Sequence, residues 1–487
     1  MPLMLLPQAG AGKERAAPGI MRAMMAEGGQ RTWRMLAGVA RATITPPVGS
    51  TWQGGYGARR RAAQGVHDDL CATALVLQEV DAESGSRVAL ITADLVSLSD
   101  DQVQRVRQLV GEQGAVAPER IMICCSHTHG GPATRKSASL PVNDTYLATL
   151  EQHLAGVVYQ AARRLQPVAV GLGHGEARFN VNRRLRLPDG QTAMRPNPDG
   201  AVDRGVAVLR LDSALADDEG EARNAGAGSP DEPGRAEPAG VIGHRPLALL
   251  FRFTCHATSL GGQNYLVTAD YPGAARRFVE RAYGDSSDGA AAAGEKVRTM
   301  AMFLPGCFGN VRPNLTAPAG GFRSATWEEL AALGRQLGSA AVQAGEAVRD
   351  PTSPQRGADL SGPVGAASAR IELPLEPNDA GRQSWPAEVQ VLRVGAVYLV
   401  GLPGEVFVEI GWRTQRAVAA AARVPAEHVL VQGYSNGNVG YVPTAAAIPE
   451  GGYEVGAWKN SDRPAGFTDE AERLLAETAA TLAGELA

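Results

Sequence analysis

The stretch that most constrains this chain is residues 121–132, with the sequence IMICCSHTHGGP. Its first six residues are apolar or small and include neither Gly nor Pro, which predicts a buried strand. His127-Thr128-His129 follows, and then a Gly-Gly-Pro break. Residues two apart in a strand point to the same face, so two imidazoles project together into a loop. This pattern is typical of a metal site in which one or both His bind the ion. A pair of hydrogen-bonded structural histidines is equally compatible, because two ligands do not complete a site.

Composition excludes several classes of protein. With 487 residues, 44% of them hydrophobic and 20% charged, the chain is long enough for one large α/β unit with insertions. A net charge of −4 without any basic run lacks the electrostatic footprint of nucleic-acid binding. No uncharged apolar stretch reaches the length of about 18 residues that a transmembrane helix needs.

The cysteine content and the N-terminal residues indicate the cellular compartment. The five cysteines are an odd, sparse set without a CxxC motif, which is not a disulfide framework and favours a reducing compartment. The opening MPLMLLPQ has too short an apolar run, and no basic residues before it, to be a signal peptide. We therefore expect a cytoplasmic protein.

Alternating strand and helix signals predict an α/β fold, with one mixed sheet flanked by helices and a site at strand ends. Helices are expected at residues 100–113, 144–165, 406–421 and 469–486. Residues 1–36 are expected to form a loose tail and residues 37–487 a single domain. An exposed insertion is expected at about residues 214–240, which are rich in Gly, Ala, Pro, Asp and Glu.

Polar residues recur where other predicted strands end. His256 closes one apolar run, Glu405 follows a second, and Tyr434 and Tyr441 follow a third. Taken singly, His256 is most simply a histidine at the core edge, Glu405 a carboxylate at a helix N-terminus, and Tyr441 a packed aromatic. Taken with the His-x-His motif, they make the N/O ligand inventory of a zinc hydrolase that keeps a position open for water.

The order of these motifs resembles the neutral/alkaline, non-lysosomal ceramidase family. The matching motifs are Gly65-Val66-His67, residues 126–132 (SHTHGGP), Asn180-Val181-Asn182-Arg183, His256-Ala257-Thr258-Ser259-Leu260 with Asn264 and Asp270, Gly309-Asn310-Val311-Arg312-Pro313-Asn314, Leu402-Pro403-Gly404-Glu405, Gly440-Tyr441-Val442 and Gly452-Tyr453-Glu454. They extend in the family's order over residues 37–487.

The resemblance implies one zinc ion per chain and a role for each matched residue. The implied zinc ligands are His127, His256, Glu405 and Tyr441, with the Tyr441–Tyr453 spacing favouring Tyr441 over Tyr434. The implied catalytic residues beside the scissile amide are His129, Arg183 and Tyr453. The expected substrate contacts are Arg312, Asn310 and Tyr434. Asp270 is expected to orient His256 without binding the metal itself.

Two departures from the family matter. Family ceramidases have a Ser where this chain has Arg312, and an Arg cannot act as a nucleophile or give up its proton. Its planar fork favours a carboxylate or phosphate, which predicts a substrate that is smaller and more polar or anionic than ceramide. Pairing of Arg312 with a nearby structural acid is the alternative. The family's C-terminal β-sandwich and export signal are also not expected here.

The leading hypothesis is a zinc-dependent hydrolase that cleaves an N-acyl amide bond with metal-activated water. Its partner would be a small or lipid-like N-acyl substrate, and an oligomer is possible. An esterase or lactonase at the same zinc centre is the alternative within the enzymes. A non-catalytic binding protein that has kept the fold is the alternative outside them.

Overall fold

The computed structural model describes residues 33–135, 140–213, 246–284, 299–349, 352–353 and 359–487. The first strand begins at Met35, slightly before the predicted end of the N-terminal tail. The predicted insertion at residues 214–240 and most of the predicted tail lie outside the described residues. The prediction of one domain over residues 37–487 stays a prediction.

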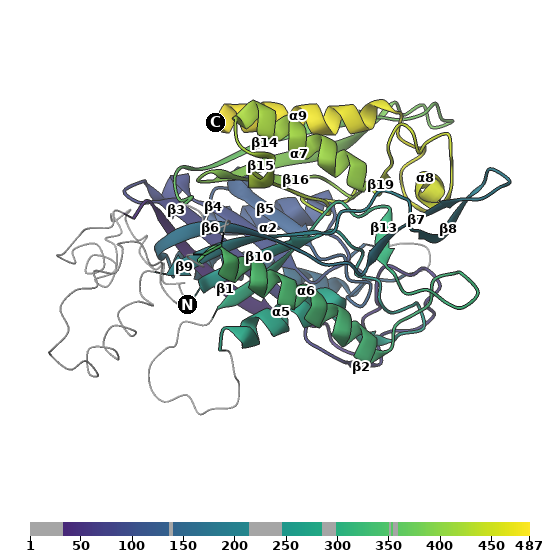
Figure 1. The fold of residues 1–487 in the computed structure, drawn as a ribbon, viewed down its shortest axis with the longest axis horizontal. Helices are drawn as coiled ribbons and strands as arrows, with labels where there is room; N and C mark the ends of the chain where they lie inside the picture. The colour runs from purple at the N-terminus through teal and green to yellow at the C-terminus, as the bar shows by residue number, and fades with distance from the viewer. Residues whose placement is uncertain (1–32, 136–139, 214–245, 285–298, 350–351, 354–358) are drawn as a thin grey trace, which may run out of the picture.

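Two β-sheets stacked face to face form the centre of the fold (Figure 1). The larger sheet has eight strands in the order β12-β10-β9-β6-β1-β3-β4-β5. Its strands are β1 (Met35–Thr43), β3 (Cys71–Glu79), β4 (Val88–Ala93), β5 (Ile121–Cys125), β6 (Gln166–Glu176), β9 (Gly205–Ser213), β10 (Pro246–Phe253) and β12 (Met300–Pro305). The smaller sheet contains β14 (Val364–Pro374), β15 (Ser384–Val394), β16 (Val397–Gly401) and β18 (Val429–Gln432).

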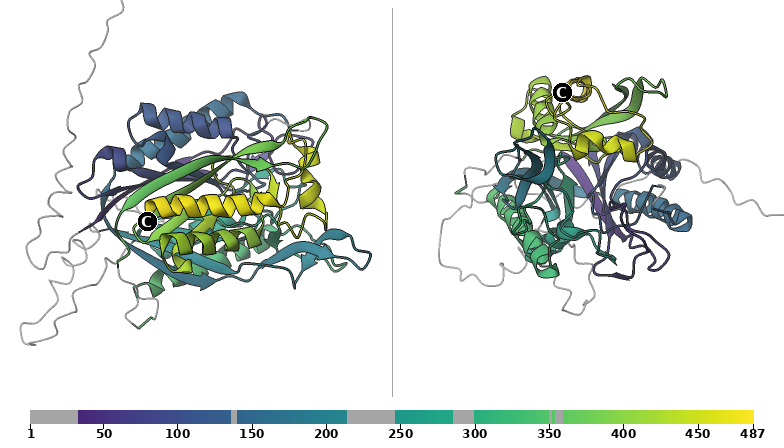
Figure 2. Two further views of the ribbon diagram at one scale, coloured as in Figure 1. Left: turned by 90° about the horizontal axis from the view of Figure 1, so that it is seen from above. Right: turned by 90° about the vertical axis from the view of Figure 1, so that its right-hand side faces the viewer.

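Helices cover both outer faces, which gives four layers (Figure 2). The larger sheet is covered by α2 (Asp100–Glu112), α3 (Asp144–Ala162), α5 (Asp270–Ala282) and α6 (Trp327–Ala347). The smaller sheet is covered by α7 (Val408–Ala422) and α9 (Glu470–Leu486). The α/β class and the mixed sheet flanked by helices are therefore confirmed. The prediction of a single sheet is incomplete, because strongly twisted sheets rarely exceed about ten strands without splitting into packed layers.

The pattern of burial explains why the strands read as unbroken apolar runs. In β3, Ala72, Ala74 and Val76 face α2 and α3, whereas Leu75 and Leu77 face the smaller sheet. Because both faces are covered, both sets of alternating positions are apolar. The continuous run at residues 121–125 has the same cause, and it forms β5 as predicted.

Several strand ends meet at one end of the molecule. Adjacent strands rotate by roughly 20–25°, and this twist across the eight strands brings the edge strands β5 and β12 into contact. The segment that follows β18 bridges the two edges. Gly433 N donates to the Pro305 carbonyl at 3.1 Å, and Cys125 N donates to the Tyr434 carbonyl at 3.1 Å. The loops after β5, β10, β12, β16 and β18 are thereby gathered together.

Short elements surround this meeting point, at the right-hand end of Figure 1. They are β2 (Gly65–Val66), β7 (Asn180–Arg186), β8 (Thr192–Asn197), β11 (Leu266–Val267), β13 (Val311–Pro313), β17 (Glu405–Val406), β19 (Tyr441–Val442) and α8 (Tyr453–Gly456). Short 3₁₀ turns occupy Ser84–Ser86, Pro118–Arg120, Ala426–His428 and Ala457–Asn460.

The predicted helix boundaries are close, with one consequential error. The helix expected from residue 406 begins at Val408, and Glu405 belongs to the short strand β17 paired with β19. Glu405 is therefore not a carboxylate at a helix N-terminus. None of the helices in the described residues combines the length and the apolar character that a membrane crossing requires. The cytoplasmic location stays a prediction.

Candidate metal centre and active site

His127 lies two residues beyond β5 in a backbone conformation that is rare for a non-glycine residue, with φ 61°. The conformation is fixed by a hydrogen bond from its backbone N–H to the Leu95 carbonyl at 2.9 Å. On the ring, Nδ1 lies 2.7 Å from the Val96 carbonyl, so Nδ1 carries the proton and donates it. The lone pair of Nε2 is then left free for a ligand.

His256 follows β10 and is completely buried. Its Nδ1 lies 2.6 Å from the Phe308 carbonyl and 3.0 Å from the Val311 carbonyl, so Nε2 again carries the free lone pair. Burial lowers the pKa of His256 to about 3, with the nearby Arg183 charge adding to the effect. The ring is therefore neutral at pH 7, the form that binds a metal.

The prediction that Asp270 orients His256 is wrong. The Asp270 carboxylate accepts hydrogen bonds from the Ser259 backbone N–H and hydroxyl and from the Tyr271 N–H. It thereby fixes the turn after His256, while the carbonyls of Phe308 and Val311 orient the imidazole itself. Backbone carbonyls are acceptable partners for a ligating His, and sequence gives no sign of them.

Glu405 completes a convergent set of donors. Its Oε2 lies 3.1 Å from His256 Nε2 and 3.4 Å from His127 Nε2. Burial disfavours the charged carboxylate, but His127 and His256 outweigh it and hold the pKa of Glu405 well below its usual range. Two imidazoles oriented by backbone carbonyls and one ionised carboxylate are the donor chemistry of a zinc site.

His129 adds a third imidazole to the same cluster. Its Nε2 lies 3.2 Å from His127 Nε2, and ligand atoms of His127, His129 and His256 all lie within 4.8 Å of one another. This group can hold a metal ion. His129 differs from the other two because its buried Nδ1 has no hydrogen-bond partner among the described residues. Burial, reinforced by His127 and His256, lowers the pKa of His129 well below its usual value.

Gly55 makes room for the His129 ring. A Cβ at Gly55 would lie 2.3 Å from His129 ring atoms, and φ at Gly55 is +86°. Any side chain at residue 55 would therefore displace His129 and would also meet backbone strain. The Tyr56 ring also packs against the His129 ring in a T-shaped arrangement, with centroids 4.7 Å apart.

Tyr441 and Arg183 form a buried network beside Glu405. Tyr441 lies opposite Glu405 in the β17–β19 pair, and its hydroxyl hydrogen-bonds Glu405. Arg183 donates to the Tyr441 hydroxyl at 2.9 Å and to Glu454 at 2.7 Å. The pKa of Tyr441 is raised well above its usual value, chiefly by burial. Arg183 therefore positions Tyr441 rather than facing open space.

Tyr453 and Tyr434 occupy contrasting positions. Tyr453 is 52% exposed at the start of α8 and hydrogen-bonds Tyr441, which places it at the rim. Tyr434 is buried, stacks on Phe308 with centroids 4.3 Å apart, and lies 4.3 Å from the His127 ring. Its hydroxyl is buried without a partner among the described residues. Tyr434 thus borders the cluster of histidines, whereas Tyr453 is linked to it through Tyr441.

The Asn310 side chain is engaged within the protein, and its predicted contact with substrate stays a prediction. Its amide nitrogen donates to Glu409 at 2.9 Å, and its oxygen accepts from the Val408 N–H at 3.0 Å. Asn310 therefore holds the start of α7 against the loop after β12. This use of the side chain depends on a partner about a hundred residues away, which spacing cannot reveal.

Arg312 lies beside the histidines through a shared segment. His129 N donates to the Ala257 carbonyl, and Arg312 donates to the next carbonyl, that of Thr258, at 3.3 Å. The guanidinium stacks on Phe322, 4.3 Å from the ring centroid. Within the described part of the chain no carboxylate lies within ion-pair distance of it, so the alternative of a structural acid gains no support. Arg312 Nε and Thr258 Oγ1 are both buried without a partner there.

Sequence reasoning missed three residues that shape this site. Glu454 holds both Arg183 and Arg184, at 2.7 and 2.9 Å. Phe308 supplies the carbonyl for His256, and Tyr56 packs against His129. Glu454 follows Tyr453 within a motif already recognised, so its acidic character was a usable signal. Phe308 and Tyr56 act through a carbonyl and a ring edge, for which no residue pattern exists.

Comparison with known proteins gives a consistent family. No protein-family model matches the chain. The chain is 24% identical to a neutral ceramidase of Pseudomonas aeruginosa, over 91% of this chain and 73% of the relative. It is 23% identical to a neutral ceramidase of Mycobacterium tuberculosis, over 85% of this chain and 72% of the relative.

Solved structures support the same fold. The crystal structure of the Pseudomonas aeruginosa neutral ceramidase superposes with a TM-score of 0.71 at 18% identity, covering 94% of this chain and 75% of that one. A ceramidase complexed with C2 gives a TM-score of 0.70, covering 93% and 75%. Similarity in sequence to two neutral ceramidases over most of the chain, and in fold to a solved one, supports the resemblance to the neutral ceramidase family that the ordered motifs indicate.

Proposed function

We propose that this protein is a zinc-dependent hydrolase that cleaves an N-acyl amide bond. The observation that carries the proposal is the convergence of His127 Nε2 and His256 Nε2 on Glu405 Oε2, at 3.4 and 3.1 Å. Backbone carbonyls that accept from Nδ1 set both imidazoles in the tautomer whose Nε2 can bind a metal, as is usual for ligating histidines. We assign one zinc ion to His127, His256 and Glu405, with Tyr441 as the fourth ligand.

A bound zinc ion would polarise the scissile carbonyl and lower the pKa of a water molecule towards 7. The chain's own residues supply the remaining requirements. Glu405 stays ionised and compensates the ion's charge, while Arg183 orients the Tyr441 hydroxyl. The neutral His129 ring can take a proton from water at one nitrogen and return it to the leaving amine, because its Nδ1 is not engaged elsewhere.

Tyr453 is suited to the developing negative charge on the substrate oxygen. Tyr453 lies at the exposed rim, and its hydroxyl is oriented by its hydrogen bond to Tyr441. A donor oriented in advance towards an oxyanion is worth several kcal/mol when the transition state forms. Arg183, buried behind Tyr441, contributes by positioning and by its positive charge.

The substrate is proposed to be smaller and more polar than ceramide, with an anionic group that binds Arg312. Three buried polar atoms near the histidines have no partner in the described structure: Arg312 Nε, Thr258 Oγ1 and His129 Nδ1. Buried polar groups are normally satisfied, so atoms left open around a site are available for a ligand. A carboxylate or phosphate oxygen would pair with the first two directly.

The test is metal content followed by a matched set of substrates. Zinc-loaded protein should contain about one ion per chain, and should release fatty acid from an N-acyl amino acid faster than from its methyl ester or from a medium-chain ceramide. Ceramide cleaved as fast as the anionic substrate would refute the assignment of Arg312 while keeping the amide hydrolase. Hydrolysis of a matched ester alone would favour an esterase. Protein that binds no zinc would remove the catalytic proposal.

A further inference from the structure

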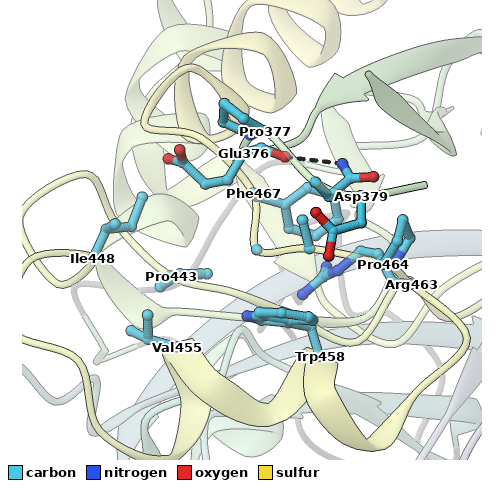
Figure 3. Close-up of a pocket in the computed structure, with 13 residues that line it drawn as sticks. Glu376, Pro377, Asp379, Pro443, Ile448, Val455, Trp458, Arg463, Pro464 and Phe467 are labelled. Atoms are coloured by element: carbon cyan, nitrogen blue, oxygen red, sulfur yellow. Dashed lines mark hydrogen bonds between the residues drawn. The ribbon is translucent and has the colours of Figure 1, made fainter. Parts of the chain in front are cut away.

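A second cavity lies behind the wall that carries Tyr441, and nothing in the proposed reaction uses it (Figure 3). Its volume is about 350 Å³, within the roughly 300–1,000 Å³ range of small-molecule sites. The apolar part of its lining comes from Pro443, Ile448, Val455, Trp458 and Phe467. Figure 3 shows Ile448, Pro443 and Val455 along one side and the indole of Trp458 along the next.

One buried cation faces this cavity. Arg463 is 4% exposed, and its guanidinium stacks 3.7 Å from the centroid of the Phe467 ring, extending between Phe467 and Trp458 in Figure 3. Its Nη1 donates to the carbonyls of Val439 and Tyr441, at 2.9 and 3.5 Å. Its Nε is buried without a partner among the described residues, none of which places a carboxylate within ion-pair distance.

A buried guanidinium without an acid is an uncommon arrangement. Burial lowers the pKa of Arg463 to about 10, which means that the surroundings do not compensate its charge. Stacking on Phe467 and two carbonyls satisfy only part of the group, since a guanidinium carries five N–H donors. The missing partner is an anion that can accept from Nε and the adjoining Nη2 together, which is the fork geometry of a carboxylate.

We propose that this cavity is a second ligand site, for a monocarboxylate with an apolar body. The carboxylate pairs with Arg463, and the apolar body packs on Trp458, Ile448 and Val455. The exposed acids Glu376 and Asp379 at the rim repel an anion only weakly, because water and salt screen them. The proposal does not depend on the reaction at the histidine cluster.

The position of the site couples it to Tyr441. The same guanidinium that binds the ligand holds the carbonyls on either side of Gly440, so a bound carboxylate acts on the segment that carries the Tyr441 hydroxyl. Val455 lies two residues beyond Tyr453, in the same short helix. The ligand therefore contacts residues near both tyrosines in the chain, Pro443 and Val455, without entering the catalytic centre.

The experiment is calorimetric titration of the full-length protein, freed of metal by chelation so that the histidine cluster cannot attract an anion. Octanoate is the probe, with octylamine and octanol as matched cationic and neutral controls. We expect octanoate to bind with one-to-one stoichiometry and at least about tenfold more tightly than either control, since a charge-assisted bidentate pair exceeds the 1.4 kcal/mol that a tenfold difference requires.

Three variants locate the binding. Ile448→Trp fills the cavity and leaves Arg463 in place, and should abolish octanoate binding; Val455→Trp serves if the first variant fails to fold. Asp379→Asn removes a repulsive rim charge and should tighten octanoate binding by about two- to threefold, as expected for a screened surface charge. Octanoate binding that survives both filling variants, or preferential binding of octylamine, would overturn the proposal.

Discussion

The two sides of the histidine cluster are built differently. On one side, His127 and His256 each donate Nδ1–H to backbone carbonyls, and Arg183 is satisfied by Glu454, Tyr441 and the Gly309 carbonyl. On the other side, His129 Nδ1, Arg312 Nε and Thr258 Oγ1 are buried with no partner in the described structure. A satisfied network fixes geometry before any ligand arrives, whereas unsatisfied atoms leave capacity for one. The first side is therefore the holding side, and the second is the side that meets substrate.

The largest effect is expected from breaking the holding side. His127→Ala removes one imidazole from the cluster, and with it one of the two histidines that stabilise the charge of Glu405. We expect zinc content to fall below one tenth of an ion per chain, because each ligand supplies a large part of the affinity. Amide hydrolysis should fall by at least about a thousandfold, since the metal contribution to the barrier is several kcal/mol. Elemental analysis and initial rates measure both quantities.

His153→Ala is the matched control for that variant. His153 is an exposed histidine of α3 outside the histidine cluster, and its loss should change neither zinc content nor rate. Equal zinc in the wild type and in His127→Ala would contradict the assignment of the centre.

The next effect comes from the substrate side. Arg312→Met removes the guanidinium while keeping an apolar body against Phe322. We expect kcat/KM for an N-acyl amino acid to fall by about 10- to 100-fold, as for loss of a hydrogen bond to a charged group worth roughly 1.5–3 kcal/mol. Zinc content and turnover of a neutral N-acyl amide should change little.

Arg312→Lys sharpens this result. Lysine keeps the positive charge but loses the bidentate fork, so activity on the anionic substrate should recover only in part. A uniform loss on neutral and anionic substrates alike would mean that Arg312 serves the structure and not recognition.

The sequence predicts residues that lie at the ends of apolar strands, but it does not predict contacts made by turns, helix starts and backbone carbonyls. The α/β class follows from the apolar runs, and polar residues at the ends of those runs suggest a shared site, because strand ends gather in such folds. The set of His127, His256 and Glu405 is implied by the resemblance to ceramidases. Asp270 and Asn310 could not be placed in this way. Their partners, Ser259 and Tyr271 in one case and Glu409 and Val408 in the other, depend on turns and helix starts that have no periodic signal. The carbonyls that orient both imidazoles leave no trace in side-chain identity at all.

A smaller loss of activity is expected when the packing of Gly55 against the His129 ring is disturbed. Gly55→Ala would place a Cβ 2.3 Å from the His129 ring and should displace it. We expect kcat to fall by about tenfold, the share of general acid–base catalysis lost when a proton carrier is moved but not removed. KM and zinc content should stay near the wild-type values.

Gly49→Ala is a close control for the same backbone conformation. Gly49 has φ +85°, similar to the +86° of Gly55, but a Cβ there has open space within 4 Å. Both variants carry the backbone strain, so a fall in kcat confined to Gly55→Ala isolates the displaced ring. The same loss in both would show that strain alone, and not the position of His129, lowers the rate.

The last prediction concerns the stability of the metal-free protein. The pKa of His256 is about 3 in the folded state because the ring is buried, whereas an unfolded histidine has a pKa near 6.5. Between these values the unfolded chain binds the additional proton, so stability is fully present above pH 6.5 and is lost as the pH falls. From pH 6.5 to 5 the loss attributable to this residue is about 2 kcal/mol, by the conversion of about 1.4 kcal/mol per pH unit. Urea unfolding of the chelated protein should show it, and His256→Gln should flatten the profile. An equally steep profile in the variant would show that other groups cause the loss of stability in acid, and would contradict the depressed pKa of His256.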